Sequence, residues 1–336
     1  MTHLTQTQLE FFAVNGYLVV EDVLDDGDLR LLWEEYSAIL DWVAPKFLAE
    51  GRIHSSYDHL PFAQRYMAIM AEAPELIDYV EITLPLVNSQ ISLETTPNHG
   101  PGIFGLLTNP KLLDVVESVL GPEVSSNPVQ HVRLKPLMRQ VRQEVAENSY
   151  VGKTTWHQDL AGLLDEADET QVLTTWVAIT DAPLDRGPLC VIPGSHRKGG
   201  LTTHCMGKDV QVENFIPAKL LGDDLGNKTV VPLPVRRGSV VLLNCFTEHA
   251  ALSNTSTELR WSFDLRWHPT GQPSGRPAFP AFVARSRSNP AQELRDPAVW
   301  KQLWTAAKEQ IIAGQYEGDI YNMARLEAFA NSPVCA

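Results

Sequence analysis

The stretch Thr155-Trp156-His157-Gln158-Asp159 carries the clearest chemical signal in the chain. Side chains alternate between the two faces of a strand, so an extended backbone here places His157 and Asp159 on the same face. An imidazole and a carboxylate that lie side by side can supply two ligands to one metal ion. We therefore expect this segment to hold part of a metal site, with a further ligand contributed from elsewhere in the chain.

His249 is the best candidate for that further ligand. It follows a long apolar segment, 238–246, that has the composition of a strand. Two histidines and one carboxylate on one face of an ion leave three positions open, which is the arrangement of non-haem Fe(II) oxygenases. A single His-x-Asp triplet is weak evidence because such short motifs arise by chance. The interpretation therefore depends on the motifs around it.

Strand-like segments dominate the chain from Trp156 to Trp267. They are short, rich in β-branched and aromatic residues, and joined by Gly/Pro turns; they cover 172–179, 189–192, 229–235, 238–246 and 259–267. Serial short strands of this kind predict a sandwich or jelly roll. Helical patterns come before the strands and do not alternate with them, which argues against a doubly wound sheet. The expected fold is mainly β with flanking helices.

A single domain over 1–336 is the simplest division, because no repeat, linker or low-complexity tract interrupts the chain. We expect a largely helical part over 1–125, a jelly-roll core over 126–268, and a loop and helix over 269–336. Within the helical part, 84–93 reads as a strand and 95–105 as a loop. Residues 51–75 fit equally well a loop that closes over a site or a packed helical connection.

Composition limits the classes of partner. The net charge is −14, from 27 Lys and Arg against 41 Asp and Glu, which argues against nonspecific binding to nucleic acid or anionic membranes. No apolar run approaches membrane-spanning length, and the N-terminus lacks the pattern of a cleaved signal. The four cysteines show no two-residue spacing, and so few in a chain this long fit a reducing compartment. We expect a cytoplasmic protein, either a monomer or a homodimer.

Arg260 offers a guanidinium eleven residues after His249. Its planar fork matches a carboxylate, as a dicarboxylate co-substrate bound to iron by its 2-oxo acid end would require. A surface ion pair is the alternative role for Arg260. The apolar neighbours Leu259, Trp261 and Phe263 argue instead for an interior position. Ser262 shares a strand face with Arg260 and could add a hydrogen bond.

The motifs taken together resemble one known family. In chain order they are Phe11-Phe12, Asn15-Gly16-Tyr17-Leu18-Val19, Leu134-Lys135-Pro136, Trp156-His157-Gln158-Asp159, Trp176-Val177-Ala178, the run from Gly187 to His196, His249, Asn254 and Arg260. This set resembles the phytanoyl-CoA dioxygenase family of Fe(II)- and 2-oxoglutarate-dependent oxygenases. The resemblance covers most of the chain and implies a double-stranded β-helix, a jelly roll of the cupin type.

The resemblance also implies roles for individual residues. His157, Asp159 and His249 would bind iron, Arg260 would bind the distal carboxylate of 2-oxoglutarate, and Trp176 would pack against that co-substrate. His131 lies where the family places a further co-substrate contact. Ala251 stands where the family often has a small hydroxyl residue, and Ser262 could take over that hydroxyl. The presence of Asp159 disfavours halogenation, because halogenating relatives lack this carboxylate.

Substrate contacts are expected from two further segments. Gln90, within 88–92, is assigned to the pocket, and Arg285 is assigned to its entrance together with Arg287. If these arginines line the entrance, an acidic substrate is favoured. His196 ends a Pro-Gly-Ser-His turn and is interpreted as structural. Trp300 is interpreted as a core or subunit contact.

The implied activity is the oxidation of an unactivated C–H bond of a small molecule, with O2 and 2-oxoglutarate consumed and succinate and CO2 released. Hydroxylation, desaturation and ring formation all remain open, as does the identity of the substrate. Two alternatives come from other classes: a catalytically silent jelly-roll binding protein, and a cupin-like isomerase or hydrolase with a different divalent metal. Succinate release excludes the first, and strict dependence on O2 and 2-oxoglutarate excludes the second.

Overall fold

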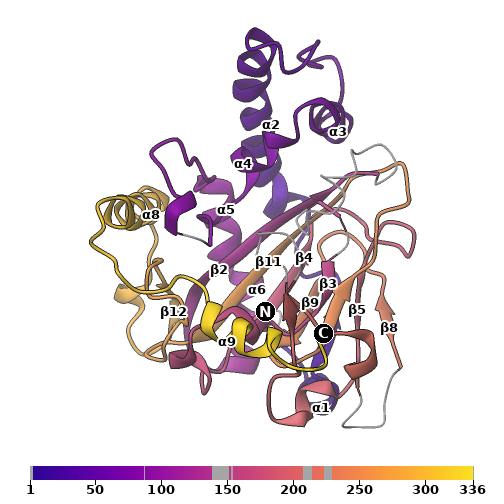
Figure 1. Cartoon of the computed structure of the whole chain (residues 1–336), viewed down its shortest axis with the longest axis vertical. Coiled ribbons are helices and arrows are strands. Elements are labelled where there is room, and N and C mark those ends of the chain that lie inside the picture. Colours follow the sequence, from indigo (N-terminus) through magenta and orange to yellow (C-terminus); the bar gives the residue numbers. More distant parts are fainter. Residues whose placement is uncertain are drawn as a thin grey trace.

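The computed structural model describes residues 3–86, 88–137, 151–152, 154–206, 214–222 and 229–335. Two antiparallel sheets form its centre (Figure 1). The larger has six strands in the order β1 (Tyr17–Val20), β9 (Val240–Asn244), β4 (Leu173–Ala178), β11 (Arg260–Pro269), β2 (Glu123–Lys135) and β12 (Phe282–Ser286). The smaller has four, in the order β3 (Thr154–His157), β10 (His249–Ala251), β5 (Leu189–Val191) and β8 (Val231–Leu233). The predicted mainly-β, jelly-roll architecture with flanking helices is confirmed.

The central strand β11 shows how the sequence divides the interior. Its apolar side chains, Trp261, Phe263, Leu265 and Trp267, are fully buried in the core beneath the helices. The alternate positions are polar and face the other way, because successive side chains of a strand point to opposite faces. They are Arg260, Ser262, Asp264 and Arg266. The space between the two sheets therefore has a polar floor.

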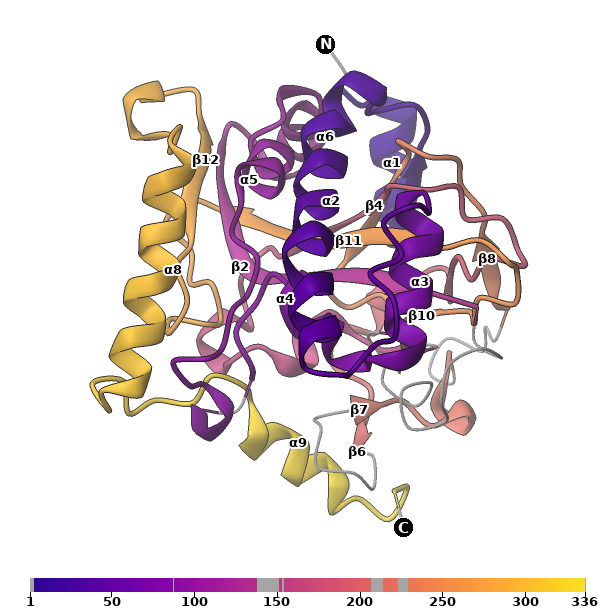
Figure 2. The ribbon, with the colours of Figure 1, turned by 90° about the horizontal axis from the view of Figure 1, so that it is seen from above.

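Helices cover the outer face of the large sheet (Figure 2). They are α1 (Gln6–Asn15), α2 (Asp26–Ala49), α3 (Phe62–Glu72), α4 (Ile77–Val80), α5 (Pro101–Leu107) and α6 (Pro110–Leu120). Asp25 caps α2 through a capping box with Asp28. The ring of Tyr36 on α2 lies 4.8 Å, centroid to centroid, from that of Trp261, and its hydroxyl donates to the Val80 carbonyl. These contacts fix the helical layer to the back of the strand that carries Arg260.

Three local expectations are resolved by the structure. The segment 51–75 contains a packed helix, α3, so the connection is helical and not a loop. The strand expected over 84–93 is wrong for the residues described there, which form a short 3₁₀ turn at Asn88–Gln90; Pro85 has no N–H for a ladder. The loop expected over 95–105 ends early, because Pro101 opens α5 at a position where a helix needs no N–H donor.

The large sheet also takes strands from outside 126–268, since β1 comes from the N-terminal part and β12 from the C-terminal part. Helix α8 (Pro297–Ile312) follows β12 and lies at that end of the molecule (Figures 1 and 2). Its Trp300 and Trp304 are buried, with Trp304 stacked on His99 at 4.5 Å between ring centroids. The interpretation of these tryptophans as core residues is confirmed.

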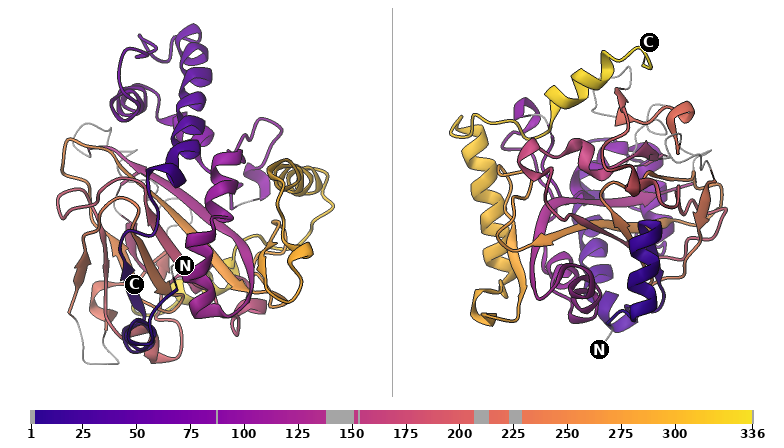
Figure 3. Two further views of the ribbon diagram at one scale, coloured as in Figure 1. Left: turned by 180° about the vertical axis from the view of Figure 1, so that it is seen from behind. Right: turned by 90° about the horizontal axis from the view of Figure 1, so that it is seen from below.

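The C-terminal helix α9 (Met323–Ala330) lies to one side of the sheets, next to β6 (Cys205–Met206) and β7 (Asn214–Phe215) (Figure 3, right). A disulfide joins Cys205 to Cys335, 130 residues later. The sequence interpretation did not foresee this bond, because neither cysteine lies in a recognisable spacing motif. No helix of the described residues is both long and apolar enough to cross a membrane.

Candidate active site

The metal-ligating side chains come together where two strands of the small sheet pair. β3 lies antiparallel to β10, and His157 stands directly opposite His249 in the register. The strand ends at His157, so Asp159 begins a 3₁₀ turn and does not continue an extended run as expected from the sequence. Gln158 is still extended, at φ −118° and ψ 134°, and this keeps His157 and Asp159 close together.

The three candidate ligands converge on one point. Nε2 of His157 lies 3.6 Å, and Nε2 of His249 3.8 Å, from Oδ1 of Asp159. One ligand atom from each residue lies within 4.8 Å of the others. This is a span that a single ion can bridge with bonds of roughly 2.0–2.2 Å and a small inward shift of the ligands. Among the described residues, no other group of histidine, cysteine and carboxylate side chains fits an ion in this way.

Both imidazoles are oriented for this role by backbone carbonyls. Nδ1 of His157 lies 2.8 Å from the Thr155 carbonyl oxygen, and Nδ1 of His249 lies 2.9 Å from that of Thr247. A carbonyl only accepts, so each Nδ1 must carry the proton and each Nε2 keeps a free lone pair for a metal. Burial, and then the neighbouring His157, lower the pKa of His249 to about 4, so His249 is neutral near pH 7.

Asp159 is held as an anion by two groups that the sequence interpretation missed. The Thr174 hydroxyl donates to Oδ2 at 2.5 Å, and the Arg266 guanidinium donates to Oδ1. Burial alone would raise the pKa of Asp159, but Arg266 and the two histidines hold it well below the usual range. Arg266 shares the inner face of β11 with Arg260 and could have been found by extending that alternation.

His204 was given no role from the sequence, yet it supports the ligand segment. Its Nε2 accepts from the backbone N–H of Gln158 at 3.0 Å, and its Nδ1 donates to the Thr202 carbonyl. Burial lowers the pKa of His204 to about 3, which keeps Nε2 available as an acceptor. The residue between two candidate metal ligands is thus fixed by a histidine 46 positions later. No local sequence pattern indicates this contact.

Arg260 is fully buried, which excludes the surface ion pair considered from the sequence. Its Nη1 donates to the Ser262 hydroxyl, whereas Nε and Nη2 have no hydrogen-bond partner among the described residues. Burial lowers the pKa of Arg260 to about 9, so it remains charged at neutral pH. A buried, charged guanidinium whose N–H donors lack acceptors strongly destabilises the fold, unless a bound ligand accepts from them. These donors fit a carboxylate.

A cavity connects this guanidinium to the candidate metal ligands. His157, His249, Trp176 and Arg260 all line it, and the Arg260 guanidinium lies 5.5 Å from the centre of the Trp176 ring. Ala251 lines it too, two residues after the distal histidine. The lining also includes Arg133, Asp264, Arg266, Thr154 and Thr174. Ser262 is not among the lining residues and instead supports Arg260 from behind.

Other residues expected in the site lie elsewhere. His131 is buried on β2 opposite Asp264, with Nδ1 3.9 Å from Glu81, but it does not line the cavity. Burial, and then the nearby Arg133, hold the pKa of His131 well below its ordinary value. Gln90 is exposed, in the 3₁₀ turn after α4, and it too is absent from the lining.

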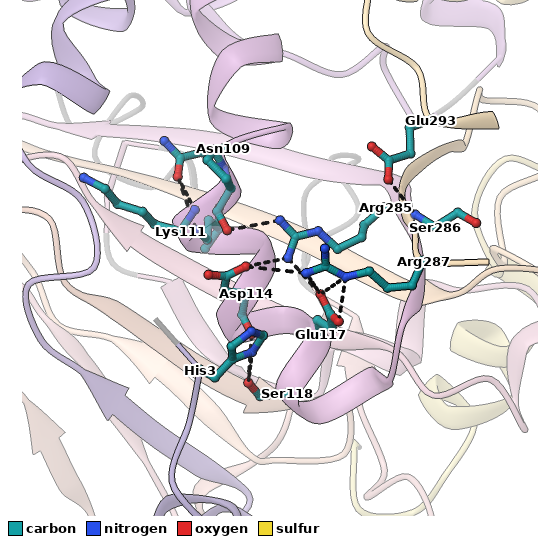
Figure 4. A network of polar contacts seen from close by, with 12 residues as sticks. His3, Asn109, Lys111, Asp114, Glu117, Ser118, Arg285, Ser286, Arg287 and Glu293 are labelled. Atoms are coloured by element: carbon teal, nitrogen blue, oxygen red, sulfur yellow. Dashed lines mark hydrogen bonds and ion pairs between the residues drawn. The ribbon is translucent and has the colours of Figure 1, made fainter. Parts of the chain in front are cut away.

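Arg285 corrects the idea of an arginine entrance to the site. It is buried on the edge strand β12, where Nη1 forms ion pairs with Asp114 at 2.7 Å and Glu117 at 2.8 Å on α6 (Figure 4). Arg287 pairs with the same glutamate. Their positive charge is used to join the edge strand to a helix, so neither arginine is placed to attract an acidic substrate. His196 is structural as expected, with Nε2 3.0 Å from the Ala13 carbonyl oxygen.

The phytanoyl-CoA dioxygenase (PhyH) family model matches residues 12–262, which include the three candidate metal ligands, Trp176 and Arg260 but not Asp264 or Arg266. The chain belongs to the phytanoyl-CoA dioxygenase family. It is similar to a phytanoyl-CoA dioxygenase of Arabidopsis thaliana, at 22% identity over 78% of this chain and 88% of the relative. An ectoine dioxygenase of Bordetella bronchiseptica is 26% identical over 75% of this chain and 71% of the relative.

Solved structures agree on the fold. The apo form of the non-haem monooxygenase ThoJ aligns with 91% of this chain and 99% of its own, at a TM-score of 0.54 and 16% identity. This phytanoyl-CoA dioxygenase family member is a non-haem Fe(II)- and 2-oxoglutarate-dependent dioxygenase, as the resemblance predicted. Its cofactor set is Fe(II) with 2-oxoglutarate and O2 as co-substrates.

Proposed function

We propose that His157, Asp159 and His249 bind the Fe(II), that Arg260 binds the distal carboxylate of 2-oxoglutarate, and that Trp176 packs against the co-substrate. The observation that carries this proposal is the cavity that joins the convergent ligands to Arg260. No described residue accepts a hydrogen bond from Nε or Nη2 of Arg260. One carboxylate can accept from both donors.

The residues of the chain then divide the work. When bound, the iron supplies the oxidising chemistry, with 2-oxoglutarate as the source of electrons. Asp159 contributes one negative charge, which Thr174 and Arg266 keep ionised. The two histidines present their Nε2 lone pairs, because each Nδ1 donates to a backbone carbonyl. Arg260 fixes the far end of 2-oxoglutarate, so that its 2-oxo acid end is directed at the ligands, and the apolar side chains Leu189 and Leu243 limit access of water to the cavity.

The reaction that we propose is the oxidation of an unactivated C–H bond of a small-molecule substrate, with succinate and CO2 released. A small substrate is supported by the enclosure of the site between the two sheets. Hydroxylation is the simplest outcome, because it requires only that the oxidised carbon take up one oxygen atom. Desaturation and ring formation differ in the fate of the same carbon and need no further residue type.

The cytoplasmic location expected from the sequence rests in part on cysteine use. The Cys205–Cys335 disulfide weighs against it, because such bonds persist in oxidising compartments. The compartment is tested by counting free thiols in protein that is purified from its native source under alkylating conditions. Four free thiols place the chain in a reducing compartment, and two place it in an oxidising one.

The proposed function is tested by succinate formation from 2-oxoglutarate. Purified apo protein should release succinate only when Fe(II), O2 and 2-oxoglutarate are all present, at a rate that a substrate increases. His249→Ala should reduce this release by at least about a thousand-fold, since it removes an iron ligand. Glu117→Gln, in the distant ion-pair cluster, is the control and should retain the wild-type rate. Oxygen-independent turnover of a compound would instead favour an isomerase or hydrolase.

A further inference from the structure

The cavity has two walls of different chemistry on either side of β11. On the β4 side lie Trp176 and the Arg260 guanidinium that stands over its ring. Leu243, on the strand beyond β4, continues this wall as an apolar surface. On the β2 side the lining is an ion pair, Arg133 with Asp264. The proposed binding of 2-oxoglutarate uses residues of the first wall. It gives no role to the Arg133–Asp264 ion pair of the second wall.

Asp264 stands at the centre of the cavity floor. In the register it lies opposite Trp176 on one side and His131 on the other, two positions before Arg266. Two residues along a strand correspond to roughly 7 Å, so Asp264 stands one side-chain row from Arg266, whose guanidinium donates to Asp159. Asp264 and Arg266 both line the cavity.

The two carboxylate oxygens of Asp264 differ. Oδ2 accepts from Nε of Arg133 at 2.9 Å, so the side chain cannot rotate freely. Oδ1 is buried and has no hydrogen-bond partner among the described residues. A buried carboxylate oxygen left without a donor is costly, and a ligand that donates to it recovers that cost. Oδ1 is therefore an oriented hydrogen-bond acceptor at the cavity, and a ligand would supply the donor.

We propose that Asp264 determines substrate specificity: its Oδ1 accepts a hydrogen bond from an O–H or N–H group of the substrate, and Arg133 positions it. This inference rests on the proposed function and narrows its substrate class. The substrates are alcohols, polyols or amines that carry the donor close to the oxidised carbon, and purely hydrocarbon chains are excluded. Arg133 acts through Asp264 as a positioning residue.

The variant Asp264→Asn inverts the contact instead of merely deleting it. Nε–H of Arg133 can only donate, so the amide must turn its oxygen toward Arg133 and its NH2 group toward the cavity. A substrate ammonium group, which only donates, then faces a donor, whereas a hydroxyl can turn its oxygen to accept from the amide and an ether oxygen gains a donor. Asp114→Asn is the matched control: Asp114 is as buried as Asp264 and is also paired with an arginine, but it lies on α6 and does not line the cavity.

The experiment measures substrate-stimulated succinate release with matched probes. The probes are myo-inositol, glucosamine, cyclohexanol with cyclohexyl methyl ether, and cyclohexylamine with cyclohexyltrimethylammonium. Within each pair, methylation removes the donor and adds volume, and the second pair retains its positive charge. For the wild type and Asp114→Asn, at least one donor-bearing probe should stimulate release at least ten-fold more efficiently, in kcat/KM, than its methylated partner.

For Asp264→Asn, that preference should fall to about one or reverse, while the KM for 2-oxoglutarate changes far less than the KM for the probe. The inference is overturned if no donor-bearing probe stimulates the wild type, or if Asp264→Asn keeps the ten-fold preference. A wild type that releases no succinate with Fe(II), O2 and 2-oxoglutarate alone overturns the proposed function itself. The two failures are therefore distinct, because only the second abolishes the unstimulated reaction.

Discussion

Arg266 donates a hydrogen bond to Oδ1 of Asp159, the same oxygen that both metal-facing histidine nitrogens approach. The arginine also donates to the Val129 carbonyl at 3.1 Å, so its guanidinium is anchored to the neighbouring strand. The charge of the carboxylate ligand therefore depends on a residue that does not itself contact the metal. Such supporting contacts tune metal affinity.

Arg266→Gln should weaken metal binding by about 10–100-fold. Without the cation, the pKa of Asp159 rises toward its ordinary value. Protons then compete with the metal at a higher pH than in the wild type, so the loss grows as the pH falls. Anaerobic titration with Fe(II), or calorimetry with Mn(II), measures this. Arg287→Gln, which removes a half-exposed arginine from the ion pairs around Glu117, should leave the metal affinity unaltered.

Arg260→Gln should raise the KM for 2-oxoglutarate by roughly a hundred-fold, which corresponds to about 3 kcal/mol for a lost charged hydrogen-bond pair. The variant should lose discrimination between 2-oxoglutarate and pyruvate, since pyruvate lacks the distal carboxylate. Steady-state kinetics with both oxo acids decides this. If the variant still prefers 2-oxoglutarate as strongly as the wild type does, another residue binds that carboxylate.

His204→Phe should reduce both stability and metal affinity. The change leaves the buried Gln158 N–H without an acceptor, at a cost of about 1–3 kcal/mol. His99→Phe is the control, because His99 is also buried and contacts the Ile82 carbonyl, but lies under α8. Urea denaturation should show losses for both variants, whereas metal titration should show a loss for His204→Phe alone.

Cys335→Ser should lower the free energy of unfolding by about 2–5 kcal/mol, because the disulfide to Cys205 closes a long loop. The loop contains the metal ligand His249, and Cys205 follows His204 directly. Denaturation with and without a reductant measures the effect. Reductant should destabilise the wild type to the level of the variant and have no further effect on the variant itself.

Glu81→Gln should remove part of the pH dependence of stability. Burial raises the pKa of Glu81 to about 7, above its unfolded value near 4.5. The folded state therefore binds a proton more tightly than the unfolded state does, and stability falls as the pH rises from about 4.5 to 7. Above that range the ionised group costs up to about 3 kcal/mol. The variant should be more stable than the wild type at pH 8 and similar to it at pH 4, as followed by urea denaturation.

Much of this site could be predicted from local sequence. Strand alternation placed His157 and Asp159 together even though the strand ends between them, because the extended Gln158 preserves their proximity. The apolar neighbours of Arg260 indicated its burial correctly, since an alternating strand next to a core has one buried apolar face. The jelly-roll fold followed from serial short strands after a helical region.

Other features were decided only by tertiary structure. The sequence does not distinguish the partners of Arg285 and Arg266. In the fold, Arg285 pairs with a carboxylate on α6, whereas Arg266 pairs with Asp159. Which carboxylate a charged side chain meets depends on the neighbouring strands and helices, and no local pattern encodes them. The amino-acid sequence thus determined which side chains could bind iron and 2-oxoglutarate. The packing of two sheets determined which buried groups hold those side chains in place, because hydrogen bonds between distant segments exist only once the chain has folded.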